Sequence, residues 1–302
     1  MPMKIKRNTL RKLRILPEII VTLAVISLMV FAALRYAGCI NDISGHKLED
    51  GTVAVHIIDV GQGDCVLIET CDGVVLIDSG TNDSEQALFD YLENLNIKVV
   101  DYFIMTHAHD DHVGGADMIL ESFDVGSVMY GDYGYDEDLL GLIIDSECGV
   151  MPNDFGTEWS LGGARFSVIS WDGIDYGEDL NDHSIVIRME YGDTSFIFAG
   201  DATVNTEKNI LASFESGELD CDFLKSGHHG SVTSSGEEFV SELSPDLVAI
   251  SCGIDNSYGL PDKEVLEIYE RFGAECHRTD KEGSMVFVSD GLSVTKKKGG
   301  SN

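Results

Sequence analysis

The sequence contains little proline and few basic residues. Only five of its 302 residues are proline, whereas 32 are glycine. This balance suits many tight connections between strands better than a disordered chain. Lysine and arginine together number 20 against 53 aspartates and glutamates, so the formal net charge is −33. Because so acidic a surface repels polyanions at long range, we expect no stable nucleic-acid binding from the bulk charge.

The seven cysteines show no CxxC pair and no zinc-ribbon spacing. A zinc site made of cysteines is therefore not indicated. Most of these cysteines lie in or beside apolar, strand-like stretches, which favours buried free thiols. Pairing in an oxidising compartment stays open, because the sequence cannot choose the partners.

The few basic residues are concentrated at the N-terminus. Six of the first 14 residues are lysine or arginine, and the remaining chain carries 14 basic against 53 acidic residues, a formal charge of −39. Residues 19–34 then form an uncharged apolar run of 16 residues. With its flanks this run comes close to the roughly 20 residues that a bilayer requires.

This order of charge and hydropathy predicts a single membrane anchor. We expect a basic cytoplasmic arm at residues 1–14 and a transmembrane helix at residues 15–40. The positive-inside rule places the N-terminus in the cytoplasm and the rest of the chain outside the cell membrane, while secretion after cleavage is the alternative. Residues 41–51 are expected to be a linker, residues 52–295 a folded domain and residues 296–302 a polar tail.

Brief apolar runs separated by Gly and Asp predict an α/β domain. Strands are expected at residues 53–60, 65–70, 73–80, 99–106, 164–171, 183–192, 194–200, 222–227, 247–253 and 285–290. Helices are expected at residues 84–95, 113–123, 205–214, 236–243 and 263–272. Residues 131–159 are acidic and weakly patterned, which predicts a surface excursion. The order of elements repeats itself and suggests two similar layered halves.

Three of the nine histidines lie within six residues, in THAHDDHVGG (106–115). His107 and His109 point the same way if the backbone is extended. Asp111 and His112 follow where the two glycines allow the chain to turn toward a helix. Imidazoles and a carboxylate at the end of an apolar strand suit one or two divalent metal ions.

The spacing HxHxDH resembles the signature of the metallo-β-lactamase superfamily. Further motifs resemble the soluble hydrolase domain of its ComEC/Rec2 competence-protein branch. In chain order they are DVGQGD (59–64), LIDSG (76–80), NDHSIVI (181–187), AGD (199–201), KSGHHGS (225–231) and RTDKEG (278–283). The resemblance covers about residues 52–292. It implies a metallo-β-lactamase αββα four-layer sandwich, here preceded by one N-terminal transmembrane helix.

The resemblance also implies two divalent metal ions, with Zn²⁺ expected before Mn²⁺ or Fe²⁺. The implied ligands are His107, His109 and His183 for one ion, Asp111, His112 and His228 for the other, and Asp201 as a bridge. His229 is the alternative to His228 and could instead contact the substrate. Asp78 and Asp64 are implied to orient the ligands from behind.

The implied reaction is hydrolysis by a metal-activated hydroxide, with Asp111, Asp201 and His228 as the catalytic groups. The metal pair lowers the pKa of a shared water and polarises the bond under attack. The branch resemblance favours a phosphodiester substrate, such as DNA or a nucleotide, and hence a phosphodiesterase or nuclease.

Three basic residues are candidate phosphate contacts: Lys225, Arg278 and Lys281. The acidity of the chain nevertheless suits a small phosphoester, or a neutral lactone or β-lactam, better than a polymer. A non-catalytic exported binding module is a further hypothesis, although the intact histidine cluster argues against it. The branch commonly shows a YGHP-like motif, and this chain has YGLP (258–261). The absent histidine weakens the transfer of nuclease activity in particular.

Overall fold

The computed structural model describes residue 48 and residues 51–170 and 179–297. The predicted basic arm and transmembrane helix, residues 1–40, lie outside the described residues. Within the described ranges, no helix has the length and apolar character needed to cross a membrane.

The first of two β-sheets has eight strands in the order β15-β14-β1-β2-β3-β4-β5-β6. Its strands are β1 (Val53–Ile57), β2 (Val66–Thr70), β3 (Gly73–Ile77), β4 (Val99–Met105), β5 (Asp124–Tyr130), β6 (Gly149–Val150), β14 (Met285–Ser289) and β15 (Val294–Lys296). The pairs from β15 to β3 are antiparallel, whereas β3, β4, β5 and β6 run parallel.

The second sheet has seven strands in the order β13-β12-β11-β10-β9-β8-β7. Its strands are β7 (Glu158–Leu161), β8 (Ala164–Val168), β9 (Ile187–Tyr191), β10 (Thr194–Phe198), β11 (Phe223–Lys225), β12 (Leu247–Ile250) and β13 (Glu275–Arg278). The pairs from β7 to β10 are antiparallel and those from β10 to β13 are parallel. Each sheet therefore has an antiparallel and a parallel part, in agreement with the two similar halves that the sequence predicted.

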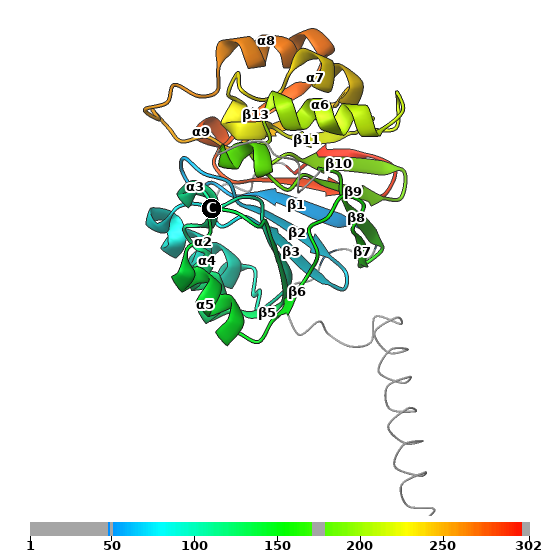
Figure 1. Ribbon diagram of the computed structural model, residues 1–302. Coiled ribbons are helices and arrows are strands. Elements are labelled where there is room, and N and C mark those ends of the chain that lie inside the picture. Colours follow the sequence, from blue (N-terminus) through cyan, green and yellow to red (C-terminus); the bar gives the residue numbers. More distant parts are fainter. Residues whose placement is uncertain (1–47, 49–50, 171–178, 298–302) are drawn as a thin grey trace, which may run out of the picture. The chain divides into compact units, whose positions relative to one another are not determined.

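Helices cover the outer faces of both sheets (Figure 1). The helices are α2 (Glu85–Asn94), α3 (Asp110–Val113), α4 (Ala116–Ser122), α5 (Glu137–Asp145), α6 (Val204–Ser213), α7 (Glu237–Leu243), α8 (Lys263–Phe272) and α9 (Thr279–Glu282), with short 3₁₀ turns η1 (Asn82–Ser84), η2 (Leu180–His183) and η3 (Gly227–Gly230). Helices α2, α4 and α5 pack on the first sheet, and α6, α7 and α8 pack on the second. The result is the four-layer αββα sandwich that was predicted for the folded domain.

The buried strands explain why their sequences are almost continuously apolar. In β3, Val75 and Ile77 belong to the core between the two sheets, whereas Val74 and Leu76 face the helices. Because successive side chains of a strand point to opposite faces, a strand covered on both faces needs apolar residues at every position. Such a strand appears in the sequence as a continuous apolar run and does not show alternating apolar and polar residues.

Several helices and strands were not predicted from the sequence. Residues 131–159 are not merely a surface excursion, because they contain α5, β6 and β7. Leu139 and Ile143 of α5 are buried in the core against the first sheet, although the rest of this helix is acidic or partly exposed. The strand predicted from residue 183 begins only at Ile187, after the turn η2.

A buried carboxylate on α6 holds the loop that leads into α7. Glu207 is 3% exposed and accepts hydrogen bonds from the backbone nitrogens of Ser235 and Gly236. Burial raises its pKa from 4.5 to about 7, because the two backbone donors only partly offset the loss of solvation. The same loop carries Thr233, whose hydroxyl contacts His228.

This carboxylate is expected to make folding stability depend on pH. Between about pH 4.5 and pH 7 the folded chain retains a proton on Glu207 that the unfolded chain has lost, so stability falls as the pH rises. The shift corresponds to about 3 kcal/mol. Urea unfolding of the metal-free wild type and of Glu207→Gln, followed across this range, measures the contribution as the difference between the two pH slopes. Equal pH slopes in the wild type and in Glu207→Gln would contradict the raised pKa of Glu207. The hydrogen bond lost in the variant does not affect this comparison, because its cost is the same at every pH.

Candidate metal centre

The candidate ligands follow strands whose carboxyl ends meet. His107 and His109 come directly after β4, and Asp201 comes shortly after β10. His228 and His229 follow β11 in the turn η3. Ligands of layered α/β proteins commonly bind at the carboxyl ends of parallel strands, so the topology alone brings these residues to one place.

The HxHxDH segment changes from extended backbone to a single helical turn. His109 is the N-cap of α3 with φ −76° and ψ 145°, so His107 and His109 lie on extended chain, while Asp111 and His112 lie in the turn. The Nε2 atom of His107 is 3.0 Å from Nδ1 of His109. A Cβ atom at Gly114 would lie 2.5 Å from a neighbouring backbone nitrogen, so this close approach requires glycine.

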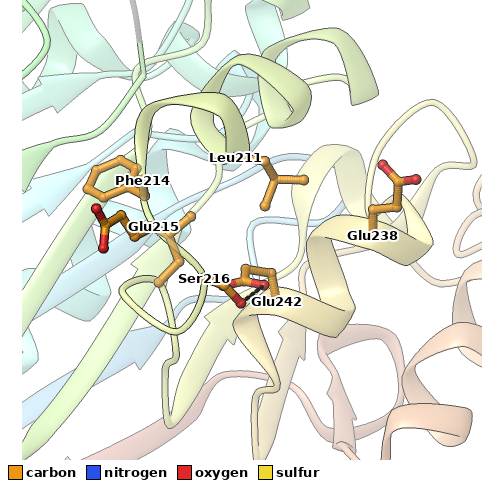
Figure 2. A pocket seen from close by; sticks show the side chains of 7 residues that line it. Leu211, Phe214, Glu215, Ser216, Glu238 and Glu242 are labelled. Atoms are coloured by element: carbon orange, nitrogen blue, oxygen red, sulfur yellow. Dashed lines mark hydrogen bonds between the residues drawn. The ribbon is translucent and has the colours of Figure 1, made fainter.

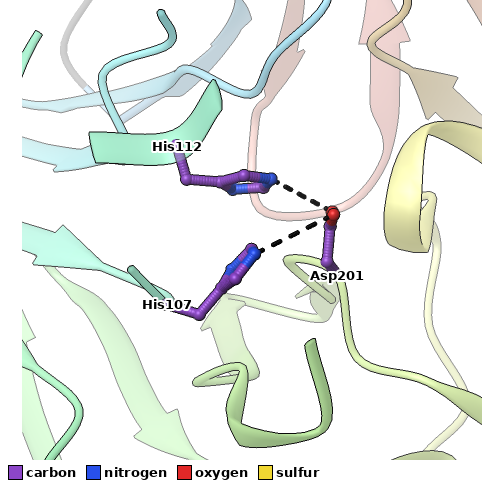
Figure 3. A group of neighbouring side chains, drawn as sticks. All are labelled: His107, His112 and Asp201. Atoms are coloured by element: carbon purple, nitrogen blue, oxygen red, sulfur yellow. Dashed lines mark ion pairs between the residues drawn. The ribbon is translucent and has the colours of Figure 1, made fainter. Parts of the chain in front are cut away.

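Four imidazoles converge on the carboxylate of Asp201, which is 1% exposed. The Nε2 atom of His112 lies 3.2 Å from its Oδ1. The Nε2 atoms of His228, His229 and His107 lie 3.6, 3.8 and 4.0 Å from its Oδ2. Figure 3 shows His107 and His112 approaching Asp201 from neighbouring positions. Asp201 therefore occupies the centre of the cluster, as a bridging ligand would.

Asp78 contacts the ring nitrogen of His112 that faces away from Asp201. Its Oδ2 lies 2.7 Å from Nδ1 of His112, and its two oxygens accept hydrogen bonds from the backbone nitrogen and the hydroxyl of Thr106. Asp78 follows β3 in the left-handed region, at φ +59°. This contact orients the His112 ring so that Nε2 faces Asp201.

Asp64 and Lys225 form a buried ion pair on the other side of the centre. The Lys225 Nζ atom lies 2.6 Å from Oδ2 of Asp64 and also donates to the carbonyl of Ser226. Lys225 is 1% exposed. Its burial and its pairing contradict the predicted phosphate contact. Asp64 lies behind the ligands as expected, since its Oδ1 is 3.4 Å from Nδ1 of His229.

The donor atoms fit a divalent cation. His107, His112 and Asp201 offer ligand atoms within 4.8 Å of one another, and so do Asp111, His112 and His229. In addition, Nε2 of His112 and Oδ1 of Asp201 are buried without a hydrogen-bond partner. Buried polar atoms that face one another in this way are normally satisfied, and a metal ion satisfies both. Two further groups use Asp64, whose charge is already balanced by Lys225.

Comparison with known protein families agrees with this geometry. The family model of the metallo-beta-lactamase superfamily matches residues 58–253. The chain belongs to this superfamily. The matched segment begins in the loop after β1, includes the HxHxDH segment, Asp201 and the His228–His229 pair, and ends just after β12.

Two curated relatives of this superfamily member are ComE operon protein 3 and Recombination protein 2. The chain is 31% identical over 255 residues to ComE operon protein 3 of Bacillus subtilis, covering 77% of this chain and 32% of that protein. It is 28% identical over 264 residues to Recombination protein 2 of Haemophilus influenzae, covering 85% of this chain and 32% of that protein. The chain thus spans about a third of the length of these relatives. The similarity is the one that the sequence motifs indicated.

A solved structure shows the same fold. The metallo-beta-lactamase fold protein YhfI from Bacillus subtilis superposes with a TM-score of 0.56 at 14% sequence identity. The superposition covers 79% of this chain and 100% of that chain. At this identity the similarity concerns the fold alone.

The structure places His229, and not His228, next to Asp111. The Nε2 atom of His229 is 3.2 Å from Oδ2 of Asp111, and these two residues form a ligand group with His112. His228 was predicted to join that group, but its Nε2 approaches Asp201 instead. The physical reason is the backbone of η3, where both histidines are left-handed (φ +47° and +53°), a conformation that the apolar run before them does not reveal.

His183 is not brought into the cluster of ligand atoms. Among the described residues, the four groups of closely spaced donors include neither His183 nor His109 and His228, but His109 and His228 have a ring nitrogen within 3.6 Å of His107 or Asp201. Its ring instead lies 4.7 Å, centroid to centroid, from the ring of Tyr133. The hydroxyl of the next residue, Ser184, contacts Nδ1 of His107 and accepts a hydrogen bond from the backbone nitrogen of Asp201.

The two other candidate phosphate contacts differ in their surroundings. Arg278, at the end of β13, donates two hydrogen bonds to the carboxylate of Asp280 (2.9 and 2.7 Å). This bidentate pair neutralises the charge that a phosphate would need. Lys281 is exposed on α9.

The electrostatics of the centre follow from burial and from close opposite charges. Burial would raise the pKa of Asp201, but His112, His229 and His107 hold it well below its usual range. Burial would lower the pKa of His229, but Asp201 and two further carboxylates raise it to about 10. Without a cation, the carboxylates therefore retain protons on neighbouring imidazoles, and a bound metal ion would replace those protons.

Some residues that contact the histidines of the centre could not be predicted from the sequence. Thr106, Ser184, Thr233 and the carbonyl of Ser251 each contact a ring nitrogen of a histidine in the cluster. Single hydroxyls and carbonyls are too common for their spacing to predict such a role. Only the assembled fold identifies them.

A separate pocket lies between the end of α6 and α7 (Figure 2). It has a volume of about 250 Å³ and combines an apolar floor with carboxylates, one of which, Glu242, accepts a hydrogen bond from Ser216. Its lining residues are Leu211, Phe214, Glu215, Ser216, Leu219, Glu238 and Glu242. None of them belongs to the metal centre, and no histidine lies among them.

Proposed function

We propose that the chain is a membrane-anchored hydrolase that uses two divalent metal ions to cleave phosphodiesters. The observation that carries this proposal is the convergence of four imidazole Nε2 atoms on the buried carboxylate of Asp201. Membership of a superfamily that consists mostly of metal-dependent hydrolases supports the enzymatic part. The similarity to proteins named for recombination and for competence, Recombination protein 2 of Haemophilus influenzae and Competence protein ComA of Neisseria gonorrhoeae, supports the choice of a phosphodiester.

The metal ions would be held by the histidines of the centre together with Asp111 and Asp201. When bound, they would supply Lewis acidity and a water of lowered pKa; Zn²⁺ suits these ligands first, and Mn²⁺ or Fe²⁺ next. The chain itself positions the substrate. The side chains of Asp111 and His228 are 34% and 24% exposed, whereas Asp201 and His112 are buried. A substrate would therefore approach the centre from the side of Asp111 and His228.

The charges around the centre favour a small phosphodiester over a long polymer. Lys225 and Arg278 are each engaged by a carboxylate, so they do not form an open basic surface. The chain as a whole carries a formal charge of −33. These same observations support a second candidate, the hydrolysis of a neutral ester such as a lactone or β-lactam.

The proposed location follows from the N-terminal segment. Residues 15–40 would anchor the chain in the cell membrane, with residues 1–14 in the cytoplasm and the hydrolase domain outside. Release of the domain by cleavage is the alternative. An alkaline wash of isolated membranes distinguishes the two, because an anchored chain stays in the pellet and a cleaved chain is found in the medium.

Hydrolysis of bis(p-nitrophenyl) phosphate tests the proposed activity. We expect the purified full-length chain to turn over this substrate when loaded with Zn²⁺ or Mn²⁺ and to lose the activity in EDTA. The matched control is His107→Ala/Asp111→Ala, which removes one ligand from each side of Asp201 and should be inactive. Turnover that survives both EDTA and this double substitution would reject a metal-dependent reaction.

Two other outcomes separate the candidates. A chain that binds two metal ions but leaves the phosphodiester intact would reject the first candidate, and a chromogenic lactone and a β-lactam would then be tested. A chain that binds no metal would reject the enzyme and favour an exported binding module.

A further inference from the structure

We propose that His228, and not His183, is the third histidine ligand of the metal ion bound by His107 and His109. The Gly-His-His-Gly turn would then supply one ligand to each of the two ions. This inference rests on the proposed two-metal centre and assigns one of its ligands. It departs from the arrangement that the sequence motifs implied, in which His183 has this role.

The backbone of the turn directs both adjacent histidines to one atom. His228 and His229 have φ values of +47° and +53°, and their Nε2 atoms lie 3.6 and 3.8 Å from the same Oδ2 of Asp201. A left-handed conformation costs a residue other than glycine roughly 1–2 kcal/mol. Two such residues in succession are retained only where the surrounding structure requires them, which commonly occurs at functional sites. Here the strained turn directs the rings of two neighbouring histidines toward one carboxylate.

The second ring nitrogen of His228 is held as in the other histidines of the centre. Its Nδ1 is hydrogen-bonded to the hydroxyl of Thr233 at 2.8 Å. The Nδ1 atom of His112 is 2.7 Å from Asp78, and that of His229 donates to the carbonyl of Ser251 at 3.1 Å. Histidines that bind metal almost always engage their other ring nitrogen in this way, which fixes the ring and leaves Nε2 for the ion. In His228, Nδ1 is bonded to Thr233 and Nε2 faces Asp201, as this arrangement requires.

The distances from Asp201 to His228 and to His107 are close to those between ligands of one metal ion. The Oδ2 atom of Asp201 lies 3.6 Å from Nε2 of His228 and 4.0 Å from Nε2 of His107. Ligand atoms that each lie about 2.0–2.2 Å from a tetrahedral metal ion are separated by roughly 3.4 Å. Oδ2 of Asp201 is therefore close to the separation from each of these two nitrogens that ligands of one ion have.

The segment around residue 183 presents a different side chain to the centre. Ser184 is 1% exposed, its hydroxyl is 3.4 Å from Nδ1 of His107, and it accepts a hydrogen bond from the backbone nitrogen of Asp201. His183 precedes it at the end of η2, and its ring lies against Tyr133, which is 53% exposed. Ser184 thus contacts the ring nitrogen of His107 that does not face Asp201, while the ring of His183 lies against Tyr133.

Metal stoichiometry and affinity test the assignment without any substrate. The purified full-length wild type, His228→Gly and His183→Ala are each titrated with Zn²⁺ and with Co²⁺, and bound metal is counted by mass spectrometry after dialysis. Glycine is chosen at position 228 because it accepts the left-handed backbone, so the turn keeps its shape. Far-UV circular dichroism and the ion retained by Asp111, His112 and His229 report that each variant is folded.

We expect two ions in the wild type and in His183→Ala, with dissociation constants that agree within about 3-fold. His228→Gly should keep one tightly bound ion and bind the second at least about 100-fold more weakly, since loss of a ligand must exceed the ~10–100-fold effect of losing a ligand's partner. Thr233→Val should weaken the same ion by about 10-fold.

Loss of the second ion in His183→Ala, with or without its loss in His228→Gly, would overturn the assignment. Retention of both ions in His228→Gly would overturn it as well. Failure of the proposed function gives a different result, because two bound ions without hydrolysis would reject the phosphodiesterase and leave the ligand assignment intact. A wild type that binds no metal would reject both.

Discussion

Substitution of Asp201 by asparagine is expected to lower the affinity for both metal ions by more than about 1,000-fold, because removal of a mere partner of a ligand already costs ~10–100-fold. Four imidazoles approach this carboxylate to 4.0 Å or less. Asparagine has almost the same shape but carries no charge, so the loss reports electrostatics and coordination and does not report packing. Hydrolysis of bis(p-nitrophenyl) phosphate should fall with the metal content.

Competition with a chelator of known affinity measures this loss. The matched control is Asp193→Asn, which removes one negative charge from the exposed turn between β9 and β10 and should leave both affinities unchanged. If Asp201→Asn still bound two ions with affinities close to the wild type, Asp201 would not be the bridging ligand, and the centre would have to be assigned anew.

Substitution of Lys225 by methionine is expected to destabilise the fold by about 3–5 kcal/mol, the usual cost of leaving one partner of a buried ion pair without the other. The side chains of Lys225 and Asp64 are only 1% and 3% exposed, and methionine keeps the length of the lysine stem without its charge. Asp64 would then be a buried carboxylate without its closest cation. The double variant Asp64→Leu/Lys225→Met should recover most of the loss, because it removes both charges.

Urea unfolding in the presence of EDTA measures this effect apart from metal binding. Lys263→Met is the matched control, since Lys263 pairs with Glu267 on the surface of α8 and is 85% exposed. This control should change the unfolding free energy by less than about 1 kcal/mol. Similar losses in the two single variants would show that the buried pair has no special energetic role.

The overall fold could largely be predicted from the sequence because its strands are buried on both faces. Short continuous apolar runs such as residues 73–77 indicate strands covered on both faces, because Gly and Asp residues that favour turns bound them on each side. The short edge strands β7, β13 and β15 were missed, as was β5. Three or four residues that are partly exposed carry too few apolar positions to show a pattern, and their pairing energy comes from a neighbouring strand.

The candidate centre was predictable to the extent that it is local. His107, His109, Asp111 and His112 lie in one six-residue segment at the end of β4, so their proximity needs only an extended strand that turns into a helix. The ligands from distant segments were predicted less well. The sequence placed His228 beside Asp111, whereas the structure brings His229 there; it also predicted His183 as a ligand, whereas the ring of His183 lies against Tyr133.

The sequence by itself determined that the chain has a layered α/β domain with a histidine and aspartate cluster at the end of a buried strand. These properties depend on hydropathy and on spacing over a few residues, which the sequence contains directly. Only the tertiary structure decided that Lys225 neutralises Asp64, 161 residues away, and which of two adjacent histidines faces Asp111. The first depends on how the two sheets pack, and the second depends on left-handed backbone angles at His228 and His229 that no local pattern of residues reveals.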